Sequence, residues 1–487
     1  MSSILIKNGI LVNEGRSFKG DILISNGRIA KIVNHEELGD QAAIGNSCIL
    51  DSLTLDNEPC FEDICKQSDT IDICSGDTCS IGCNVIDAEG MFVIPGVVDD
   101  QVHFREPGGT YKGDIESESS SAVLGGVTSY MDMPNNNPPT ITVEAIKAKE
   151  RIAEKSSYAN YSFYLGATND NIDQILSIDS EQICGVKVFM GSSTGNMLVD
   201  NEDTLERIFA ESPILIATHC ESESVIKENL RSAIEKYGED NIPFGEHPNI
   251  RSREACIEST KRAIELALKH NTRLHILHIS TKEEIELIKN SGSDRITGEV
   301  CVHYLFFDDT YYDRLESKVK CNPAIKSSED REAIIKAVKE GIIKVVATDH
   351  APHTRQEKEA TYIKSPSGLP LVRHSLQIMM EMRATGVFTI EEIVDRMCHS
   401  PALNFEIRER GFLKEGYHAD ITIIDPARKY HIQHDKPQYK CGWSPLEGTT
   451  FGSTIMHTII NGVSVVSDGK LTGARNGHKL LFGRQDL

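Results

Sequence analysis

The sequence is short of basic residues. Its 487 residues include 51 Lys and Arg against 73 Asp and Glu, which gives a formal net charge of −22. Nucleic acids and anionic membranes attract proteins that carry a basic surface. We therefore expect neither as a partner. A small anionic substrate stays compatible with this charge, provided that Arg, His or a metal ion supplies positive charge locally.

Long apolar runs are also missing. No stretch reaches the roughly 18 apolar residues that span a bilayer. The opening stretch, MSSILIKNGILVNEGRSFKG, has no basic segment followed by an apolar core. These features predict a cytoplasmic protein, in which scattered cysteines are reduced thiols. Seven cysteines are of this kind: Cys184, Cys220, Cys256, Cys301, Cys321, Cys398 and Cys441.

A segment between Glu36 and Asn84 is rich in cysteine but lacks a C-x2-C pair. It contains six cysteines and eleven acidic residues, with Lys66 as its one basic residue. A metal site is one interpretation, but the only nearby His ligand is His35, and the spacing is not that of a zinc site. We expect an acidic and poorly ordered surface insertion.

Strand-like and helix-like segments alternate through the middle of the chain, and we assign residues 92–410 to one domain. Eight such β-then-α units are the count of a (β/α)8 barrel. The strand-like runs are residues 92–104, 127–133, 161–168, 185–190, 214–220, 273–280, 296–305 and 344–353.

Both ends of the chain have a different texture, with short alternating runs separated by turn residues. Asn8-Gly9 and Asn26-Gly27 are the strongest short signals for a hairpin turn. We therefore predict a composite β-sandwich domain formed from residues 1–91 and 411–487.

Polar or ionisable residues end nearly every barrel run. The catalytic groups of such barrels lie at the carboxyl ends of the strands. His103, His219, His278 and Asp349 end four different runs, and imidazole and carboxylate are ligands that suit Zn²⁺. This pattern predicts a metal site at the mouth of the barrel. Asp132 and His303 end two further runs, and we assign no role to His303.

Lys187 lies in the apolar run GVKVFM, where an unpaired ammonium group is costly to bury. Two interpretations stay open. The side chain extends to solvent at the strand end, or burial lowers its pKa and frees a neutral amine. A neutral lysine can take up CO2 as a carbamate, which is an anionic ligand able to bridge two metals.

Asp349 and Arg105 indicate the kind of reaction. A carboxylate beside a metal-bound water can orient it, accept its proton and later protonate a leaving nitrogen. Arg105 follows His103 by two residues, so it faces the same side, and it can hold a carboxylate bidentately. Asn135 and Asn322 are either polar contacts or turn residues. Together these residues predict metal-assisted hydrolysis of an amide-like bond in a small anionic substrate.

Seven motifs in order resemble the dihydroorotases of the amidohydrolase superfamily. The motifs are VHFREPG, MDMPNNNP, GVKVFMGSSTGNMLVD, ATHCES, LHILHIST, KCNPAIK and ATDHAPH. The resemblance extends over nearly the whole chain except residues 36–84. The resemblance implies a metal-dependent (β/α)8 barrel with a composite β domain. It also implies the reversible interconversion of dihydroorotate and N-carbamoyl-L-aspartate in pyrimidine biosynthesis, through a metal-bound hydroxide, and a homo-oligomer.

The resemblance assigns a role to each matching position. His103, His219 and His278 would be metal ligands, Lys187 a carboxylated lysine bridging two zinc ions, and Asp349 both ligand and general acid/base. The substrate-binding positions would be Arg105, Asn135 and His353 for the carboxylate, Asn322 for the ring amide, and Ser367 and Gly368 for the loop whose backbone faces the substrate.

Gln101 departs from the family pattern, because it stands where the first His of a His-x-His pair is usual. A carboxamide oxygen is a neutral and weaker ligand for Zn²⁺ than imidazole, so either one or two zinc ions per chain are expected. Two alternatives stay open: a hydantoinase- or allantoinase-type enzyme, and a non-catalytic scaffold. Arg105 favours dihydroorotase over the first, because the other substrates have no ring carboxylate. The retained Lys187, Asp349 and His353 favour an active enzyme over the second.

Overall fold

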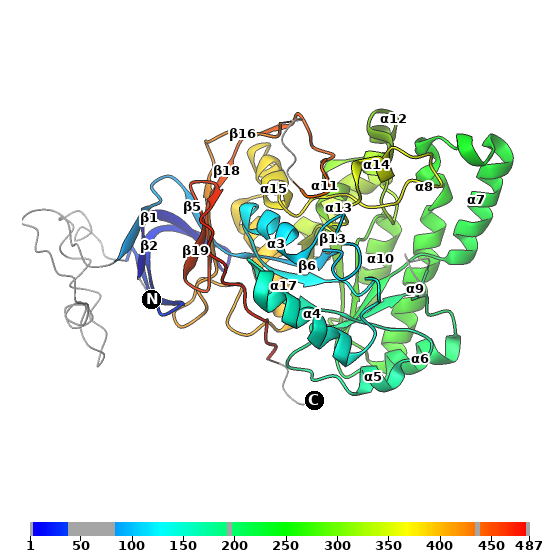
Figure 1. Ribbon diagram of the computed structural model, residues 1–487, viewed down its shortest axis with the longest axis horizontal. Coiled ribbons are helices and arrows are strands. Elements are labelled where there is room, and N and C mark those ends of the chain that lie inside the picture. The colour runs from blue at the N-terminus through cyan, green and yellow to red at the C-terminus, as the bar shows by residue number, and fades with distance from the viewer. Residues whose placement is uncertain (1–2, 38–82, 192–196, 434–438, 484–487) are drawn as a thin grey trace, which may run out of the picture.

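A computed structural model of the chain describes residues 3–37, 83–191, 197–433 and 439–483. Two regions of secondary structure lie next to each other, a β-sheet region on the left of Figure 1 and a larger ring of strands and helices on the right. Most of the predicted acidic insertion, residues 38–82, lies outside the described residues.

The larger region is a barrel of eight parallel strand positions. A three-stranded sheet and a six-stranded sheet make up its wall, and only Tyr164 separates β8 from β9. A bridge between Val102 and His350 joins the two sheets on the other side. The strands are β6 (Val97–Val102), β7 (Val127–Asp132), β8 (Asn160–Phe163) with β9 (Leu165–Gly166), β10 (Val186–Phe189), β11 (Ile216–His219), β12 (Leu274–Ile276), β13 (Ile296–Cys301) and β14 (Val345–Ala347). The predicted α/β barrel is confirmed.

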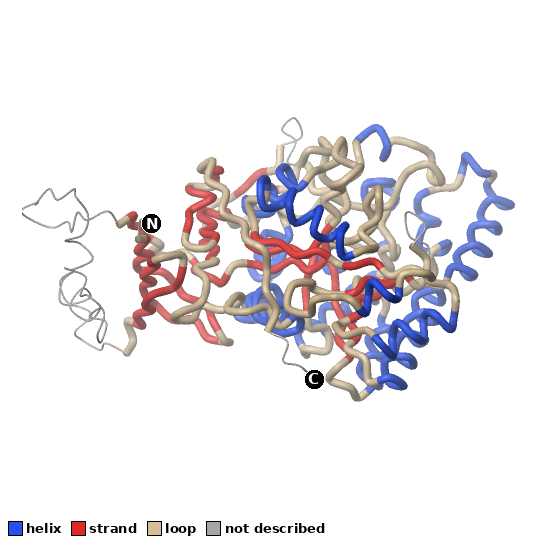
Figure 2. The backbone as a smooth tube through the Cα atoms, turned by 60° about the horizontal axis from the view of Figure 1, so that its bottom comes forward, coloured by secondary structure: helices blue, strands red, loops and turns tan. Residues whose placement is uncertain are grey.

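Helices cover the outside of this barrel, as the blue segments of Figure 2 show. Local sequence explains where they begin. Asp114 and Thr281 each form a capping box at the start of a helix, with Ser117 and Glu284 as partners. The α-helices are α3 (Ile115–Leu124), α4 (Val143–Ser156), α5 (Ile172–Leu176), α6 (Glu202–Glu211), α7 (Glu223–Tyr237), α8 (His247–Ile250), α9 (Arg253–His270), α10 (Lys282–Ser291), α11 (Val302–Phe306), α12 (Tyr312–Leu315), α13 (Ser328–Lys339), α14 (Arg355–Lys358), α15 (Ser375–Ala384), α16 (Ile390–Val394) and α17 (Ser400–Phe405).

The smaller region is a nine-stranded sheet to which both ends of the chain contribute. Its path runs β20-β19-β18-β15-β5-β1-β2-β3, and β4 pairs with β1. This arrangement agrees with the composite β domain predicted from the two termini. Its strands are β1 (Ile4–Asn13), β2 (Arg16–Ser25), β3 (Arg28–Asn34), β4 (Asn84–Asp87), β5 (Phe92–Pro95), β15 (Ile421–Asp425), β18 (Thr454–Ile460), β19 (Val463–Ser467) and β20 (Lys470–Leu471). A separate pair is formed by β16 (Tyr430–His431) and β17 (Thr450–Phe451).

One of the two predicted hairpin turns is wrong. Asn26-Gly27 does connect β2 to β3, with both residues at positive φ. Asn8-Gly9 instead lies inside β1, where the register shifts between Ile6 and Gly9 and Asn8 has a φ of 61°. The left-handed residue therefore makes a bulge. The turn to β2 falls at Glu14-Gly15, both again at positive φ.

Backbone pairing crosses both predicted domain boundaries. The run 92–104 is two strands, and β5 pairs with β1 and β15 while only β6 joins the barrel wall. At the other end, backbone hydrogen bonds place His478 and Leu480 beside Tyr161 of the barrel. The boundaries at residues 91 and 411 therefore stay predictions. The strand pairing adds β5 to the β-sheet region and places residues 478–480 against the barrel.

The seven scattered cysteines are buried, and none of them forms a disulfide within the described part of the chain, as expected of reduced thiols. No helix among the described residues combines the length and the apolar character that crossing a bilayer requires.

Candidate active site and metal centre

All twelve residues predicted for the site line one cavity of about 120 Å³. These residues are spread along the barrel sequence from Gln101 to Gly368, in strands and in the loops that follow them. The lining is Gln101, His103, Arg105, Asn135, Lys187, Phe189, His219, His278, Asn322, Asp349, Ala351, His353, Pro366, Ser367 and Gly368. The structure thus brings the predicted residues together in one cavity.

Several of these residues lie on unusual backbone. Arg105, His278 and Asp349 have φ values of 68°, 42° and 47°, which non-glycine residues adopt at a cost of about 1–3 kcal/mol each. All three lie two or three residues beyond the end of a barrel strand. Strain concentrated just beyond the strand ends marks this edge of the barrel as a functional site.

His219 and His278 face each other across the cavity. The Nδ1 atom of His219 lies 2.9 Å from Nε2 of His278. On its other side, Nε2 of His219 lies 2.9 Å from Glu221, which Arg251 also contacts. Burial raises the pKa of Glu221, but Arg251 and His219 outweigh it and leave this pKa well below its usual range, so the ionised carboxylate accepts a hydrogen bond from Nε2–H. A neutral His219 therefore turns the lone pair of Nδ1 toward His278.

Burial lowers the pKa of both histidines, and for His278 the neighbouring His219 and Lys187 add to the effect. Both rings are thus held in the neutral form, which is the form that binds a metal ion.

His103 and Asp349 make a second pair. Nδ1 of His103 lies 2.7 Å from the carboxamide oxygen of Asn135, so Nδ1 carries the proton in the neutral ring. Its Nε2 lone pair then faces Oδ1 of Asp349 at 3.0 Å. Burial alone would raise the pKa of Asp349, but a proton on Nε2 of His103 and positive charge on the nearby histidines outweigh it and lower this pKa to about 2; a metal cation between Nε2 and Oδ1 would act in the same direction. Two electron-rich atoms at this distance are suited to share a cation.

Gln101 contacts the same carboxylate through its nitrogen. Nε2 of Gln101 donates to Oδ1 of Asp349 at 3.1 Å, while its carboxamide oxygen lies 3.9 Å from the Cys301 sulfur. As placed, Gln101 therefore supports Asp349 with a donor, whereas a metal ligand would offer its oxygen.

Lys187 is buried inside β10, where it is the second residue and not the strand end. Its Nζ lies 4.8 Å from the Phe189 ring centroid, and within the described chain it forms no hydrogen bond or ion pair. Burial lowers the pKa of Lys187 to about 8, against the opposing effect of Asp349. Of the two interpretations, the structure excludes a side chain that extends to solvent and keeps the buried amine.

Arg105 and His353 define another side of the cavity. Nε of Arg105 donates to the Pro352 carbonyl at 3.1 Å. Lys112 lies 3.0 Å from Nδ1 of His353 and can only donate, so the ring proton is on Nε2, which lies 3.1 Å from the Ser367 carbonyl. Nη2 of Arg105 is 3.1 Å from the same Nε2 and is also a donor. This part of the guanidinium is therefore left to bind an acceptor other than His353.

Asp132 and His303, which end two of the predicted runs, are not among the residues that line the cavity. Asp132 ends β7 but pairs with Lys149 at 2.6 Å, and its other oxygen accepts from the Phe104 backbone at 2.9 Å. His303, which the sequence placed at a strand end, lies in α11, is fully buried and is not among the lining residues. Its burial lowers its pKa to about 4.

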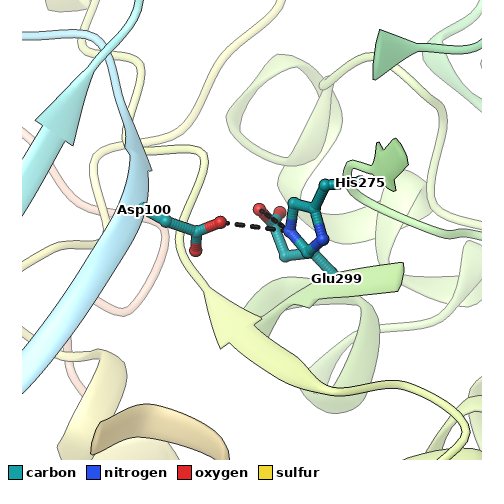
Figure 3. Close-up of side chains that lie close together, drawn as sticks. All are labelled: Asp100, His275 and Glu299. Carbon is teal, nitrogen blue, oxygen red and sulfur yellow. Dashed lines mark hydrogen bonds and ion pairs between the residues drawn. The ribbon is translucent and has the colours of Figure 1, made fainter. Parts of the chain in front are cut away.

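A separate polar cluster lies within the barrel, formed by Asp100, His275 and Glu299 (Figure 3). Their ligand atoms all lie within 4.8 Å of one another, so among the described residues they are one group that could hold a metal ion. Nε2 of His275 is 3.1 Å from Asp100 and 3.8 Å from Glu299. None of the three lines the cavity. Two carboxylates around one imidazole already form a hydrogen-bonded ion pair, and we assign this cluster to the barrel interior.

Sequence reasoning missed several residues around the cavity. Phe189, Ala351 and Pro366 add apolar lining. Glu221 was missed although it follows His219 by two within the quoted motif ATHCES, a spacing that could have indicated a carboxylate behind a ligating histidine.

Comparison with known proteins agrees with this geometry. The family model described as "Amidohydrolase family" matches residues 92–465. A dihydroorotase of Pyrococcus furiosus is 31% identical over 394 residues, covering 81% of this chain and 86% of that protein. A dihydroorotase of Halobacterium salinarum is 31% identical over 399 residues, covering 81% and 91%.

Solved structures share the fold at lower identity. An L-hydantoinase from Arthrobacter aurescens superposes with a TM-score of 0.85 at 24% identity, covering 99% of this chain and all of that chain. A dihydropyrimidinase from Brevibacillus agri gives a TM-score of 0.81 at 21% identity, with coverage of 99% and 100%. The chain is a hydrolase that belongs to the amidohydrolase family, and its most similar curated relatives include dihydroorotases.

Proposed function

We propose that this protein is a dihydroorotase, which interconverts dihydroorotate and N-carbamoyl-L-aspartate in pyrimidine biosynthesis. The observation that carries the proposal is one cavity that combines Lys187, His219, His278 and Asp349 with a guanidinium, that of Arg105, whose Nη2 is not used by its neighbours. Lys187, His219, His278 and Asp349 suit metal-assisted amide hydrolysis, and the Arg105 guanidinium suits a substrate carboxylate. The relatives named dihydroorotase support the same conclusion.

The donor set fits zinc. Neutral imidazole and carboxylate are its usual ligands, and two unprotonated ring nitrogens point at other ligating atoms, one at His278 and one at Asp349. We propose that His103, Lys187, His219, His278 and Asp349 hold the metal. Bound there, zinc would polarise the substrate carbonyl and make a bound water more acidic.

Lys187 is proposed to act as a carbamate. Its amine is buried without a carboxylate partner in the described chain, and burial lowers its pKa to about 8. A carbamate would convert this unpaired cation into an anionic oxygen ligand, which removes the burial penalty of the ammonium and would supply a further ligand for the metal beside His219 and His278.

Asp349 is proposed to move the proton. Its pKa of about 2 keeps it ionised at neutral pH, so it can accept a proton from the attacking water. Water adds to the ring amide carbonyl, the bond to the ring nitrogen breaks, and Asp349 returns the proton to that nitrogen. The carbonyl becomes the new carboxylate and the nitrogen becomes the terminal amide of the carbamoyl group.

Substrate binding is proposed to use the other side of the cavity. Arg105, Asn135 and His353 would hold the carboxylate, and Asn322 would contact the ring amide. The carboxamide oxygen of Asn322 is buried and has no hydrogen-bond partner among the described residues, so a ring N–H could satisfy it. Ser367 and Gly368 would present backbone groups to the ring.

Gln101 is proposed to orient Asp349 and to contribute little to metal binding, because its nitrogen faces the carboxylate. This assignment predicts one tightly held zinc ion per chain and a weaker second site near His103. A homo-oligomer and a cytoplasmic location are proposed from the sequence alone.

The proposal is tested by substrate choice. Purified protein loaded with zinc should open dihydroorotate and close N-carbamoyl-L-aspartate, and should act on dihydrouracil, hydantoin and allantoin far more slowly. Faster turnover of an uncharged ring would instead establish a hydantoinase-type enzyme. Absence of turnover on all of them, with zinc bound, would favour the non-catalytic scaffold.

A further inference from the structure

Two buried lysines lie behind the loop that carries Ser367 and Gly368. Lys320 is 6% exposed and Lys358 is 2% exposed. Neither forms an ion pair with a carboxylate in the part of the chain that the structure describes. A buried ammonium without an anionic partner is costly unless other acceptors satisfy it. The acceptors found here are all backbone carbonyls.

Lys358, the last residue of α14, binds both ends of the short stretch that lines the cavity. Its Nζ donates to the carbonyls of Pro366 at 2.9 Å and Gly368 at 3.2 Å, and to that of Lys320 at 3.3 Å. The same ammonium lies 5.5 Å from the Trp443 ring centroid. One side chain therefore fixes the two residues that flank Ser367.

Lys320 fixes the preceding part of the same loop. Its Nζ donates to the carbonyls of Tyr362 and Ser365, each at 2.6 Å. Its own carbonyl accepts the backbone N–H of Gly368 at 2.9 Å. Residue 320 is also two positions before Asn322, another lining residue. The loop and the Asn322 segment are thus joined through Lys320.

The loop cannot relax easily into another shape. Gly368 has a φ of +143°, and a Cβ there would lie 2.4 Å from the Ala351 carbonyl oxygen. The Ser367 carbonyl contacts His353 at 3.1 Å. Burial lowers the pKa of both lysines to about 7, while the surrounding carbonyls favour the ammonium form. The hydrogen bonds from the two Nζ atoms hold this irregular backbone in the conformation that borders the cavity, most strongly when the amines are charged.

We propose that Lys320 and Lys358 are positioning residues that hold the loop 362–368 in its substrate-binding conformation, and so set the affinity for the substrate ring. The proposal rests on the proposed function, because it takes the ring to be that of dihydroorotate. Neither lysine lines the cavity, so each acts through the loop backbone. Apart from the Lys358 bond to the Lys320 carbonyl, the side-chain bonds of the two lysines end on the loop, whereas Asp349 and the histidines are held by other residues.

The test compares Lys358→Met and Lys320→Met with wild type, and uses Lys364→Met as the matched control. Lys364 belongs to the same loop, but its side chain is 69% exposed and pairs with Asp240 at the surface. Each buried variant should raise KM about tenfold, the effect of losing one or two hydrogen bonds. The value of kcat should change much less, and zinc content should stay at the wild-type value. Lys358→Arg, which keeps a donor, should recover part of the affinity.

Two further readouts make the outcome decisive. Amide hydrogen exchange in residues 362–368 should become faster in both buried variants and not in Lys364→Met. KM should rise by a similar factor for dihydroorotate and for uncharged dihydrouracil, because the loop positions the ring; a rise confined to dihydroorotate would show attraction by charge and overturn the proposal. Unchanged exchange in the loop of either variant that folds would also overturn it. A wild-type protein that does not turn over dihydroorotate refutes the proposed function alone, since hydrogen exchange still tests the lysines.

Discussion

Replacing Arg105 with Gln should separate binding of the substrate carboxylate from every other function of the cavity. Within the described structure, the guanidinium uses Nε for the Pro352 carbonyl, whereas Nη2 faces His353, which has no acceptor to offer. Hydrogen bonds to charged groups contribute about 1.5–3 kcal/mol. Loss of the carboxylate contact should therefore lower kcat/KM for dihydroorotate by roughly 10- to 150-fold, at 1.4 kcal/mol per factor of ten.

Folding should change little in the same variant. Among the residues that the structure describes, Arg105 makes one bond to a protein acceptor, the Pro352 carbonyl, and such a bond contributes about 1 kcal/mol. Thermal melting would check this directly. Arg105→Lys is the companion variant, since it keeps the charge and loses the planar fork, and its kcat/KM should fall between those of wild type and Arg105→Gln.

The assay compares wild type and Arg105→Gln on two substrates, one with and one without a ring carboxylate. Initial rates of ring opening are measured by chromatography for dihydroorotate and for dihydrouracil, which lacks the carboxylate. Arg105→Gln should reduce the rate for the first and leave the rate for the second nearly unchanged, because the second substrate cannot use the guanidinium. Equal losses for both substrates would refute the reasoning, because Arg105 would then act on the fold or the metal centre and not on the carboxylate.

Three other changes have predicted outcomes. Gln101→His should raise the zinc content by about one ion per chain over wild type, measured by mass spectrometry of the metal, because imidazole replaces a donor that faces Asp349; no increase would show that residue 101 does not limit binding. Protein stripped of metal and CO2 should regain activity with zinc and bicarbonate faster at pH 9 than at pH 7, because the pKa of Lys187 is about 8 and CO2 reacts with the neutral amine; a rate independent of pH and bicarbonate would exclude the carbamate. Lys149→Met should lower the melting temperature by several degrees, because removing one partner leaves Asp132 buried and charged at a cost of about 3–5 kcal/mol; the double variant with Asp132→Asn should recover most of the loss.

The sequence indicated which residues meet in the cavity better than it indicated the local backbone. The twelve site residues meet in one cavity because barrel strands all point their carboxyl ends to one side, which the alternation of strand and helix already implied. Asn8-Gly9 shows the opposite case. The pair suits a hairpin turn and equally suits a bulge, and the choice depended on the pairing of β1 with β2, which no short window contains.

The same limit applies to side-chain roles. Asp132 and Asp349 both follow apolar strands, yet one is neutralised by Lys149 from the neighbouring helix and the other faces the cavity. Gln101 looked like a weak metal ligand by its position, and only the placed contacts show its nitrogen directed to Asp349. Such differences arise from residues far apart along the chain, so periodicity and motif spacing do not contain them.

Asp349→Asn offers the most direct test of the central claim, that this cavity opens and closes the dihydroorotate ring by proton transfer through that carboxylate. The variant keeps the size of the side chain but cannot accept the proton. Turnover of dihydroorotate should fall by on the order of 10²- to 10⁴-fold, with zinc still held by His219, His278 and Lys187. Turnover within a few-fold of wild type, in protein that retains its zinc, would contradict the account.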